Sequence, residues 1–467
     1  MQEKSRIRNQ IITVIAATLA TLCGGYHTGW TSPSLVKLQA IDSDLPVTGA
    51  QGSWIASIFS IAFLPGVFIS GLTVNRWGRK TALLLTAIPN SMSCILIVAA
   101  QNYWWFYVSR VLAGLGSGMA CTVIPMYLGE ISEDRIRGAL GVMIDLMDSL
   151  GILIAYSVGP WVSREALGCV GLAMPVLFAL IFSWMPESPH FLVMKDKPEE
   201  AEKSLKWLLR RSKVASEDMV KMTKNVECNE TNSKGTIKEL LMEKGNRKAL
   251  LIVTVLMTAQ QVSGISAIRA YTGLIFSRAG ATLDVGMAHI ITGAVQFIGG
   301  LLGMFIVDHA GRKPLLLSSI SGCILFLVGE AAYFQLEAME FDMNSISWFS
   351  AASIVGYLLS YSIGLGCLPF VILSELFSYN VKTIATMWAI VVISISAMVV
   401  TKLYQLIADT YGIHIAFWGF AGATLLTGLF FYFVLPETKQ RSFNEIQKEL
   451  RSTKASKMAV EKPPSVC

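Results

Sequence analysis

The chain has 467 residues, of which 53% are hydrophobic and only 15% are charged, and its formal net charge is +6. A mean hydropathy of +0.54 reflects far more apolar surface than a soluble core of this size needs. The composition therefore excludes a soluble globular protein and indicates a membrane protein.

Runs of about 20 apolar residues recur along nearly the whole chain, and each is long enough to cross about 30 Å of hydrocarbon as a helix. They predict an all-α membrane protein with twelve transmembrane helices. The expected spans are residues 11–30, 51–73, 81–100, 104–127, 138–160, 168–185, 249–276, 286–307, 314–334, 348–373, 383–403 and 415–435. The first run follows MQEKSRIRNQ and could belong to a signal peptide, but its length and the later spans favour a transmembrane helix.

The loops differ in charge on the two sides of the predicted helices. Basic residues such as Arg76 and Lys313 fall on one side, and acidic residues such as Asp42 and Glu337 fall on the other. By the positive-inside rule the basic side is cytosolic, so twelve spans leave both termini inside. The expected regions are an N-terminal six-helix bundle at 1–186, a cytosolic helical linker at 187–248, a C-terminal six-helix bundle at 249–436 and a cytosolic tail at 437–467.

Three motifs recur at matching places in the two halves. GLTVNRWGRKTALLL and FIVDHAGRKPLLL each place a Gly-Arg-Lys turn between two apolar runs. GEISEDRIRG after the fourth span and SELFSYNVKT after the tenth each set an acidic residue before a basic one. PESPHFLV follows the sixth span and PETKQRSF follows the twelfth. Matched pairs of this kind indicate two six-helix halves related by duplication, as in one common class of secondary transporters.

These motifs, together with SRVLAGLGSGMACTVIPMYLGEISEDRIRGALG, QQVSGISAI and PETKQRSFNEI, resemble the sugar porter family of the major facilitator superfamily. The likeness covers essentially the whole chain and includes glucose-facilitator and insect trehalose-facilitator type members. It implies two pseudo-symmetric six-helix bundles that move a sugar across the plasma membrane by alternating access. The expected partners are a small sugar and the lipid bilayer, with no nucleic acid, and a monomer suffices for function.

The resemblance also implies a cytosolic gate that clamps the inner ends of each bundle while the outer side is open. Glycine allows the tight turn, and the arginine and lysine after it can reach carboxylates at neighbouring helix ends. The alternative is that these charges only fix the topology, which needs basic residues but not the repeated acids. The expected gate residues are Arg79, Glu130, Arg137, Glu187, Asp308, Arg312, Glu375, Lys382 and Glu437.

Polar side chains lie at mid-membrane in spans seven and eight. An amide both donates and accepts, as a sugar hydroxyl does, so Gln260, Gln261 and Gln296 are candidates for the substrate site. Gly264 would let the helix break there. The alternative is that the buried amides bond one helix to another. With what the resemblance implies, the expected substrate-binding residues are Gln260, Gln261, Ser266, Gln296, Tyr271, Phe370 and Asp145.

Charged residues also lie inside the predicted spans. A charge deep in a bilayer costs about 2.5–3.5 kcal/mol even on lenient insertion scales, so each is a functional candidate unless it reaches an interface or a partner. Asp145 and Asp148 in span five, Arg269 in span seven and Arg110 in span four form a possible intramembrane charge network. The alternative is that Arg269 extends outward and one aspartate faces water in the cavity.

The coupling mechanism depends on one position in span one. Proton-coupled relatives carry an acid there that faces the arginine of span four, and Thr28 stands at the matching position. This favours a facilitative carrier. The alternatives are a proton-coupled carrier of a sugar or polyol, and a transporter-like sensor or carrier of a non-sugar solute. No nucleophile–base pair, phosphate loop, CxxC pair or histidine cluster is visible, so no enzyme, metal site or cofactor is predicted.

Overall fold

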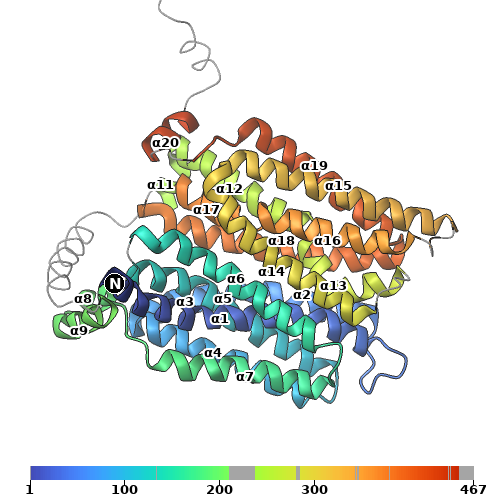
Figure 1. Ribbon diagram of the computed structural model, residues 1–467, viewed down its shortest axis with the longest axis horizontal. Coiled ribbons are helices and arrows are strands. Elements are labelled where there is room, and N and C mark those ends of the chain that lie inside the picture. Colours follow the sequence, from blue (N-terminus) through green and yellow to red (C-terminus); the bar gives the residue numbers. More distant parts are fainter. Residues whose placement is uncertain are drawn as a thin grey trace, which may run out of the picture.

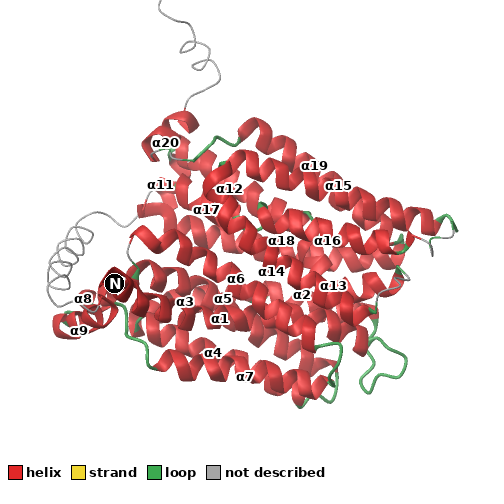
Figure 2. Cartoon of the chain, viewed as in Figure 1, coloured by secondary structure: helices red, strands yellow, loops and turns green. Residues whose placement is uncertain are grey.

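The computed structural model describes residues 2–132, 134–209, 237–279, 284–341, 343, 346–377, 379–439, 441 and 443–451. Within these ranges helix is the only regular secondary structure (Figure 2). Eleven of the described helical segments are long and apolar enough to cross a membrane. A further helix, α6 (Asp134–Val158), covers all but the last two residues of the predicted span 138–160, so every predicted span has a helical counterpart. The prediction of an all-α, multi-pass membrane protein is confirmed.

The remaining helices follow the order of the predicted spans. In the first half they are α1 (Gln2–Leu38), α2 (Gly49–Ile61), α3 (Phe63–Trp77), α4 (Arg79–Val98), α5 (Tyr103–Ile131) and α7 (Arg164–Ser183). In the second half they are α12 (Lys244–Val262), α13 (Ile265–Arg278), α14 (Val285–Ala310), α15 (Arg312–Ala338), α16 (Trp348–Ile363), α17 (Leu368–Leu376), α18 (Tyr379–Thr410) and α19 (Ile413–Val434). Short helices outside the spans are α8 (Pro189–Met194), α9 (Pro198–Leu209), α11 (Ile237–Met242) and α20 (Phe443–Arg451).

The long helices run side by side between two ends of the molecule (Figure 1). The start of α1 lies at the same end as α8, α9 and α20, and we call this end the terminal face. The opposite end, where α1 leads into α2, is the distal face. α8 and α9 pack on α5 and α1, and α20 packs on α12 and α17, so the short helices cover the terminal face of both halves.

Helices of each half pack mainly on one another. α1 lies along α6, and α4 lies along α5 and α7, whereas α15 lies along α16 and α19. The halves meet where α6 packs on α14, where α2 packs on α18, and where α1 packs on α13. Nearer the terminal face, α3 approaches α18 at Gly71 and Met387. Two of these contacts involve α2 and α13, which are the distal parts of their spans, and the most extensive one is that of α6 with α14.

Three spans consist of two helices each: α2 and α3, α12 and α13, and α16 and α17. Gly264 separates α12 from α13 because its φ of +92° lies in the left-handed region, which residues with a Cβ rarely adopt. A Cβ at this position would also lie 2.5 Å from the Phe420 ring. The break predicted at Gly264 is therefore confirmed. Span ten is also interrupted, between Ile363 and Leu368, although its continuous apolar sequence predicted one helix.

Candidate functional site

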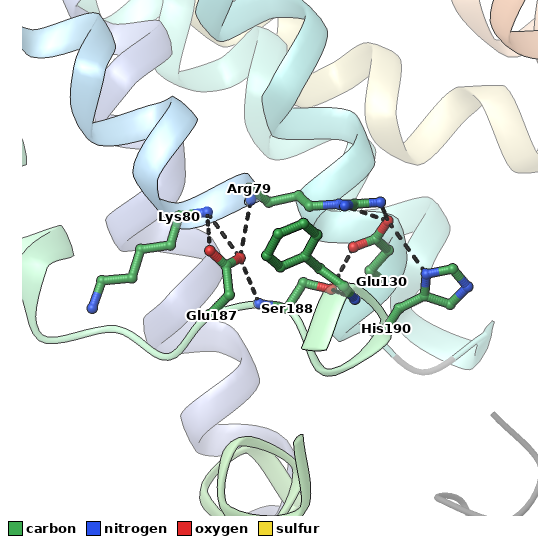
Figure 3. Close-up of polar contacts among 7 residues, drawn as sticks. Arg79, Lys80, Glu130, Glu187, Ser188 and His190 are labelled. Carbon is green, nitrogen blue, oxygen red and sulfur yellow. Dashed lines mark hydrogen bonds and ion pairs between the residues drawn. The ribbon is translucent and has the colours of Figure 1, made fainter. Parts of the chain in front are cut away.

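A charged cluster lies at the terminal face of the first half, where the turn at Gly78 leads into α4 (Figure 3). Arg79 donates from Nε and Nη2 to Glu130 Oε1 at 3.1 and 2.8 Å. The other oxygen of Glu130 accepts a hydrogen bond from Ser188 Oγ. The Arg79 side chain is only 5% exposed. This pair is therefore better shielded from water than an ordinary surface ion pair.

The carboxylate of Glu187 binds the start of α4 in the same cluster. Its Oε1 accepts from the backbone N–H groups of Arg79 and Lys80 at 3.0 Å each and from that of Ser188 at 2.8 Å. The first N–H groups of a helix have no partner within the helix, and they form the positive end of its dipole. Glu187 therefore caps α4 from a distant part of the chain and fixes the backbone that carries Arg79.

The second half repeats this arrangement after Gly311. Arg312 donates from Nε to Glu375 Oε1 at 3.1 Å. Glu437 accepts from the backbone N–H groups of Arg312 and Lys313 at 3.0 and 3.1 Å, so it caps α15 as Glu187 caps α4. The duplicated motifs thus correspond to duplicated geometry.

Each cluster lies within one half of the molecule. Arg79 and Glu130 come from α4 and α5, and Arg312 and Glu375 come from α15 and α17. Lys382 is half-buried near the start of α18. The side chains of Arg137 and Asp308 lie outside the part of the chain that the structure describes.

The two capping carboxylates differ in their electrostatic environment. Burial raises the pKa of Glu187 above its usual value, and the N–H groups that it accepts from offset this only in part. Burial also raises the pKa of Glu437, but its hydrogen bonds from four backbone N–H groups outweigh burial, so its net pKa is lowered. The folded protein therefore favours ionised Glu437 and disfavours ionised Glu187.

A cavity of about 210 Å³ lies between the two halves. Its walls come from α1, α2, α3, α5 and α6 on one side and from α13 and α18 on the other. Hydroxyl groups are prominent in the lining, and they belong to Thr28, Thr31, Ser60, Ser266, Ser394 and Thr401. The charged side chains of the lining are Arg110, Asp148 and Arg269. A hydroxyl group can donate and accept, so this lining suits a solute with many hydroxyl groups.

The cavity is closed towards the distal face. Ser32 of α1 accepts a hydrogen bond from the Gly273 N–H of α13 at 2.9 Å and shares another, of 2.8 Å, with His289 of α14. In the other direction Asp145, which precedes Asp148 by about one turn of α6, is exposed. Both observations favour an opening of the cavity towards the terminal face.

The paired amides of span seven are buried beside this cavity rather than in its lining. Gln260 donates from Nε2 to the carbonyl groups of Leu365 and Gly366 at 3.3 and 3.0 Å. These carbonyls belong to the interruption between α16 and α17. Gln261 accepts a 2.5 Å hydrogen bond from Ser266, which lines the cavity. Gln260 thus bonds α12 to the segment between α16 and α17, and Gln261 contacts the cavity lining through Ser266.

Of the other predicted substrate-binding residues, Ser266 lines the cavity, whereas Gln296, Tyr271, Phe370 and Asp145 lie outside the lining. Gln296 is 1% exposed, and neither amide atom has a hydrogen-bond partner among the described residues. The Tyr271 ring stacks on Tyr404 with centroids 5.1 Å apart. Phe370 in α17 is 36% exposed.

Arg110 is buried between α1, α2 and the cavity. Its guanidinium donates to the carbonyl groups of Ile55 and His27 at 3.0 and 2.7 Å and to Thr31 Oγ1 at 2.9 Å. Its Cζ also lies 4.4 Å from the centroid of the Phe59 ring. Neutral groups therefore satisfy this cation, and none of these contacts involves a carboxylate.

Of the expected charge network, the cavity brings together Asp148 and Arg269, which come from opposite halves. Both are half-buried. Tyr156 of α6 donates to the carbonyl group of Arg269 at 2.6 Å, which holds α13 against α6. Sequence analysis singled out Thr28 and Ser266 but not Thr31, Ser60 or Thr401. Ser394, Ala397 and Thr401 are small residues spaced along one face of α18, and this spacing is the sequence signal that could have revealed the cavity wall formed by α18.

A family model described as "Sugar (and other) transporter" matches residues 12–450. The facilitated trehalose transporter Tret1 of Polypedilum vanderplanki is 32% identical over 464 residues, which is 98% of this chain and 92% of the relative. Tret1 of Aedes aegypti is 30% identical over 98% of this chain, which spans only 57% of that relative's length.

Solved structures of a xylose transporter share the fold. The proton:xylose symporter XylE bound to 6-bromo-6-deoxy-D-glucose gives a TM-score of 0.75 at 21% identity, over 95% of this chain and 100% of that chain. The inward open conformation of XylE from E. coli gives 0.76 at 20% identity, over 93% and 98%. The chain therefore has the twelve-helix major facilitator fold.

The contrast between the two capping carboxylates can be tested by neutralising each one. A lowered folded pKa means that ionised Glu437 stabilises the fold above the ordinary carboxyl pKa of about 4.3, and that this contribution is lost as pH falls through the lowered value. A raised pKa means that ionisation of Glu187 opposes folding at pH 7, and glutamine removes that penalty. Glu437→Gln should therefore lower the Tm at about pH 7 more than Glu187→Gln does. Thermal unfolding in detergent should show this difference shrinking towards about pH 4, and equal losses at both pH values would contradict the assignment.

Proposed function

We propose, from the premise that this chain belongs to the sugar transporter family of the major facilitator superfamily, that it carries a neutral sugar of the hexose or trehalose class across the plasma membrane by facilitated diffusion. The observation that carries this proposal is the hydroxyl-lined cavity between the two halves. Asp148 and Arg269 bring opposite charges to that lining, and protein carbonyl and hydroxyl groups already bind the Arg110 cation, so a neutral solute with hydroxyl groups suits it.

The substrate would bind between α6 of the first half and α13 of the second. There Ser266 and Asp148 accept from sugar hydroxyls, while Arg269 donates to them. Gln261 supports this site through its hydrogen bond from Ser266. Asp145 is exposed about one turn from Asp148, and in this proposal it borders the path by which the solute leaves.

By the positive-inside rule, the basic residues of the terminal face support a cytosolic position for that face, with both termini inside. The cavity would then be open to the cytosol, and the outward-open state would require the two halves to rock about it. The first half, residues 1–186, and the second, residues 249–436, act as the moving bodies in this proposal. The clusters around Arg79 and Arg312 keep each half rigid at its cytosolic end.

Arg110 supports transport without proton coupling. Its hydrogen-bond acceptors are two carbonyl groups and a hydroxyl, and Thr28 lines the cavity beside it. Because the hydrogen-bond partners of Arg110 are all neutral, protonation of a carboxylate is not needed to form or break them. The second candidate is a proton-coupled sugar or polyol symporter, which the carboxylate of Asp148 on the cavity wall would favour.

Flux measurements in proteoliposomes test the proposed function. Labelled trehalose or glucose should equilibrate and exchange across the membrane, and an inward proton gradient should not drive accumulation. Accumulation that is lost in Asp148→Asn would establish the symporter instead. Exchange of neither sugar by a folded, reconstituted protein would contradict the substrate class.

The two amides should respond differently to replacement by leucine. Gln260→Leu leaves the carbonyl groups of Leu365 and Gly366 without a donor, so it should destabilise the fold by about 1–3 kcal/mol. Gln261→Leu removes the acceptor that orients Ser266, so uptake should fall about tenfold while the Tm changes less. Uptake normalised to surface protein and thermal unfolding measure these effects. A destabilised Gln261→Leu with normal uptake would show that this amide is only structural.

A further inference from the structure

A lysine in a membrane-spanning helix joins the two halves on the distal side of the cavity. Lys402 lies in α18, and its Nζ donates to Ser53 Oγ of α2 at 2.6 Å. The same Nζ lies 4.1 Å from the centroid of the Trp54 ring. α2 belongs to the first half and α18 to the second. The contact therefore crosses the boundary that must open if the cavity is to reach the distal face.

The position of this contact places it directly over the cavity. Thr401, the neighbour of Lys402, and Ala56, one turn after Ser53, both line the cavity. Ser53 is 3% exposed, so the hydroxyl that Lys402 reaches is enclosed between the helices. Nearer the end of α18, a Cβ at Gly49 would lie 3.3 Å from Asp409 Oδ2, which shows how closely α2 and α18 approach.

The chemistry of the contact suits a bond that breaks in every cycle. Among the described residues no carboxylate lies within ion-pair distance of Lys402. An ammonium between membrane helices then depends on a hydroxyl and on the face of an indole ring, which is the strongest cation–π partner among the side chains. When the halves separate on the distal side, water can replace both partners. The ammonium is therefore satisfied in both states, whereas a buried ion pair would lose much more on opening.

Other contacts across the same boundary are short-range and neutral. Ser32 of α1 bonds Gly273 and His289 directly, and these groups have no long side chain that could follow a moving helix. Among the hydrogen bonds between the two halves of the described chain, that of Lys402 is made by a charged side chain. Its four-carbon side chain is long and flexible enough to bind α2 or to release it.

We propose that Lys402, Ser53 and Trp54 form a distal latch that holds the cavity closed on the distal side and releases when the cavity opens there. The latch rests on the alternating access of the proposed function, but it does not depend on which solute is carried. Removing it shifts the protein towards the state in which the distal side is open.

Thiol labelling of a single introduced cysteine tests the latch. Ala56→Cys places a thiol on the cavity wall one turn below Ser53, and a membrane-impermeant maleimide added to intact cells reports access from the distal side. The parent chain with its eight native cysteines is labelled in parallel, so that the difference reports position 56. Adding Lys402→Met should raise the labelling rate about threefold or more, the effect expected from loss of a cation–π contact.

Two matched variants make the result specific. Lys402→Arg retains a cation that can donate and stack on indole, so its labelling rate should stay near that of the parent. Arg278→Met removes a different distal cation, which lies 3.7 Å from Asp409 and joins α13 to α18 within one half, and it should also leave the rate unchanged. If Lys402→Met does not reach the membrane, Trp54→Leu is measured in its place.

An unchanged labelling rate in Lys402→Met or Trp54→Leu would overturn the latch, and so would an equal rise in Arg278→Met. Because the labelling needs no sugar, these outcomes are distinct from a failure of the proposed function. A chain that moves neither trehalose nor glucose could still show the latch, and a working sugar carrier could still lack it.

Discussion

A carboxylate bound to the first N–H groups of a membrane-spanning helix is the interaction on which the rest of this structure depends, and it occurs once in each half. Glu187 binds the start of α4, and Glu437 binds the start of α15. Backbone donors at a helix start have no partner within the helix, and a distant acid supplies one here. The capped backbone then directs Arg79 to Glu130 and Arg312 to Glu375. In the proposed mechanism these contacts stiffen each half at its terminal face, so that the half can move as one body.

The contacts between the halves are of a different kind. Single hydrogen bonds, one cation–π contact and helix packing join them near the distal face and around the cavity. Such links are individually weak, so a bias of a few kcal/mol can redistribute the protein between two states. Strong links within each half and weak links between them are the division that a rocking mechanism requires. The cavity lies at the boundary between the halves, so a solute bound there can alter the contacts between them.

Most of the fold could be predicted because the bilayer imposes a simple pattern on sequence. The length of the apolar runs located all twelve spans, and Gly264 revealed the break in span seven because only glycine readily adopts its backbone conformation. The interruption before Leu368 could not be foreseen, since it is stabilised by Gln260 from another helix. For the same reason Asp148 and Arg269 could be placed inside their spans but not in one cavity, because packing sets the rotation of each helix.

The central claim, that two stiff halves rock about the cavity, is tested most directly by a distance across the terminal face. Asn75 at the end of α3 and His309 at the end of α14 are exposed and lie in different halves. Spin labels at these positions, in a background without native cysteines, allow double electron–electron resonance to record their separation. The account predicts two populated distances whose ratio changes when trehalose or glucose is added. A single distance that neither sugar alters would contradict it.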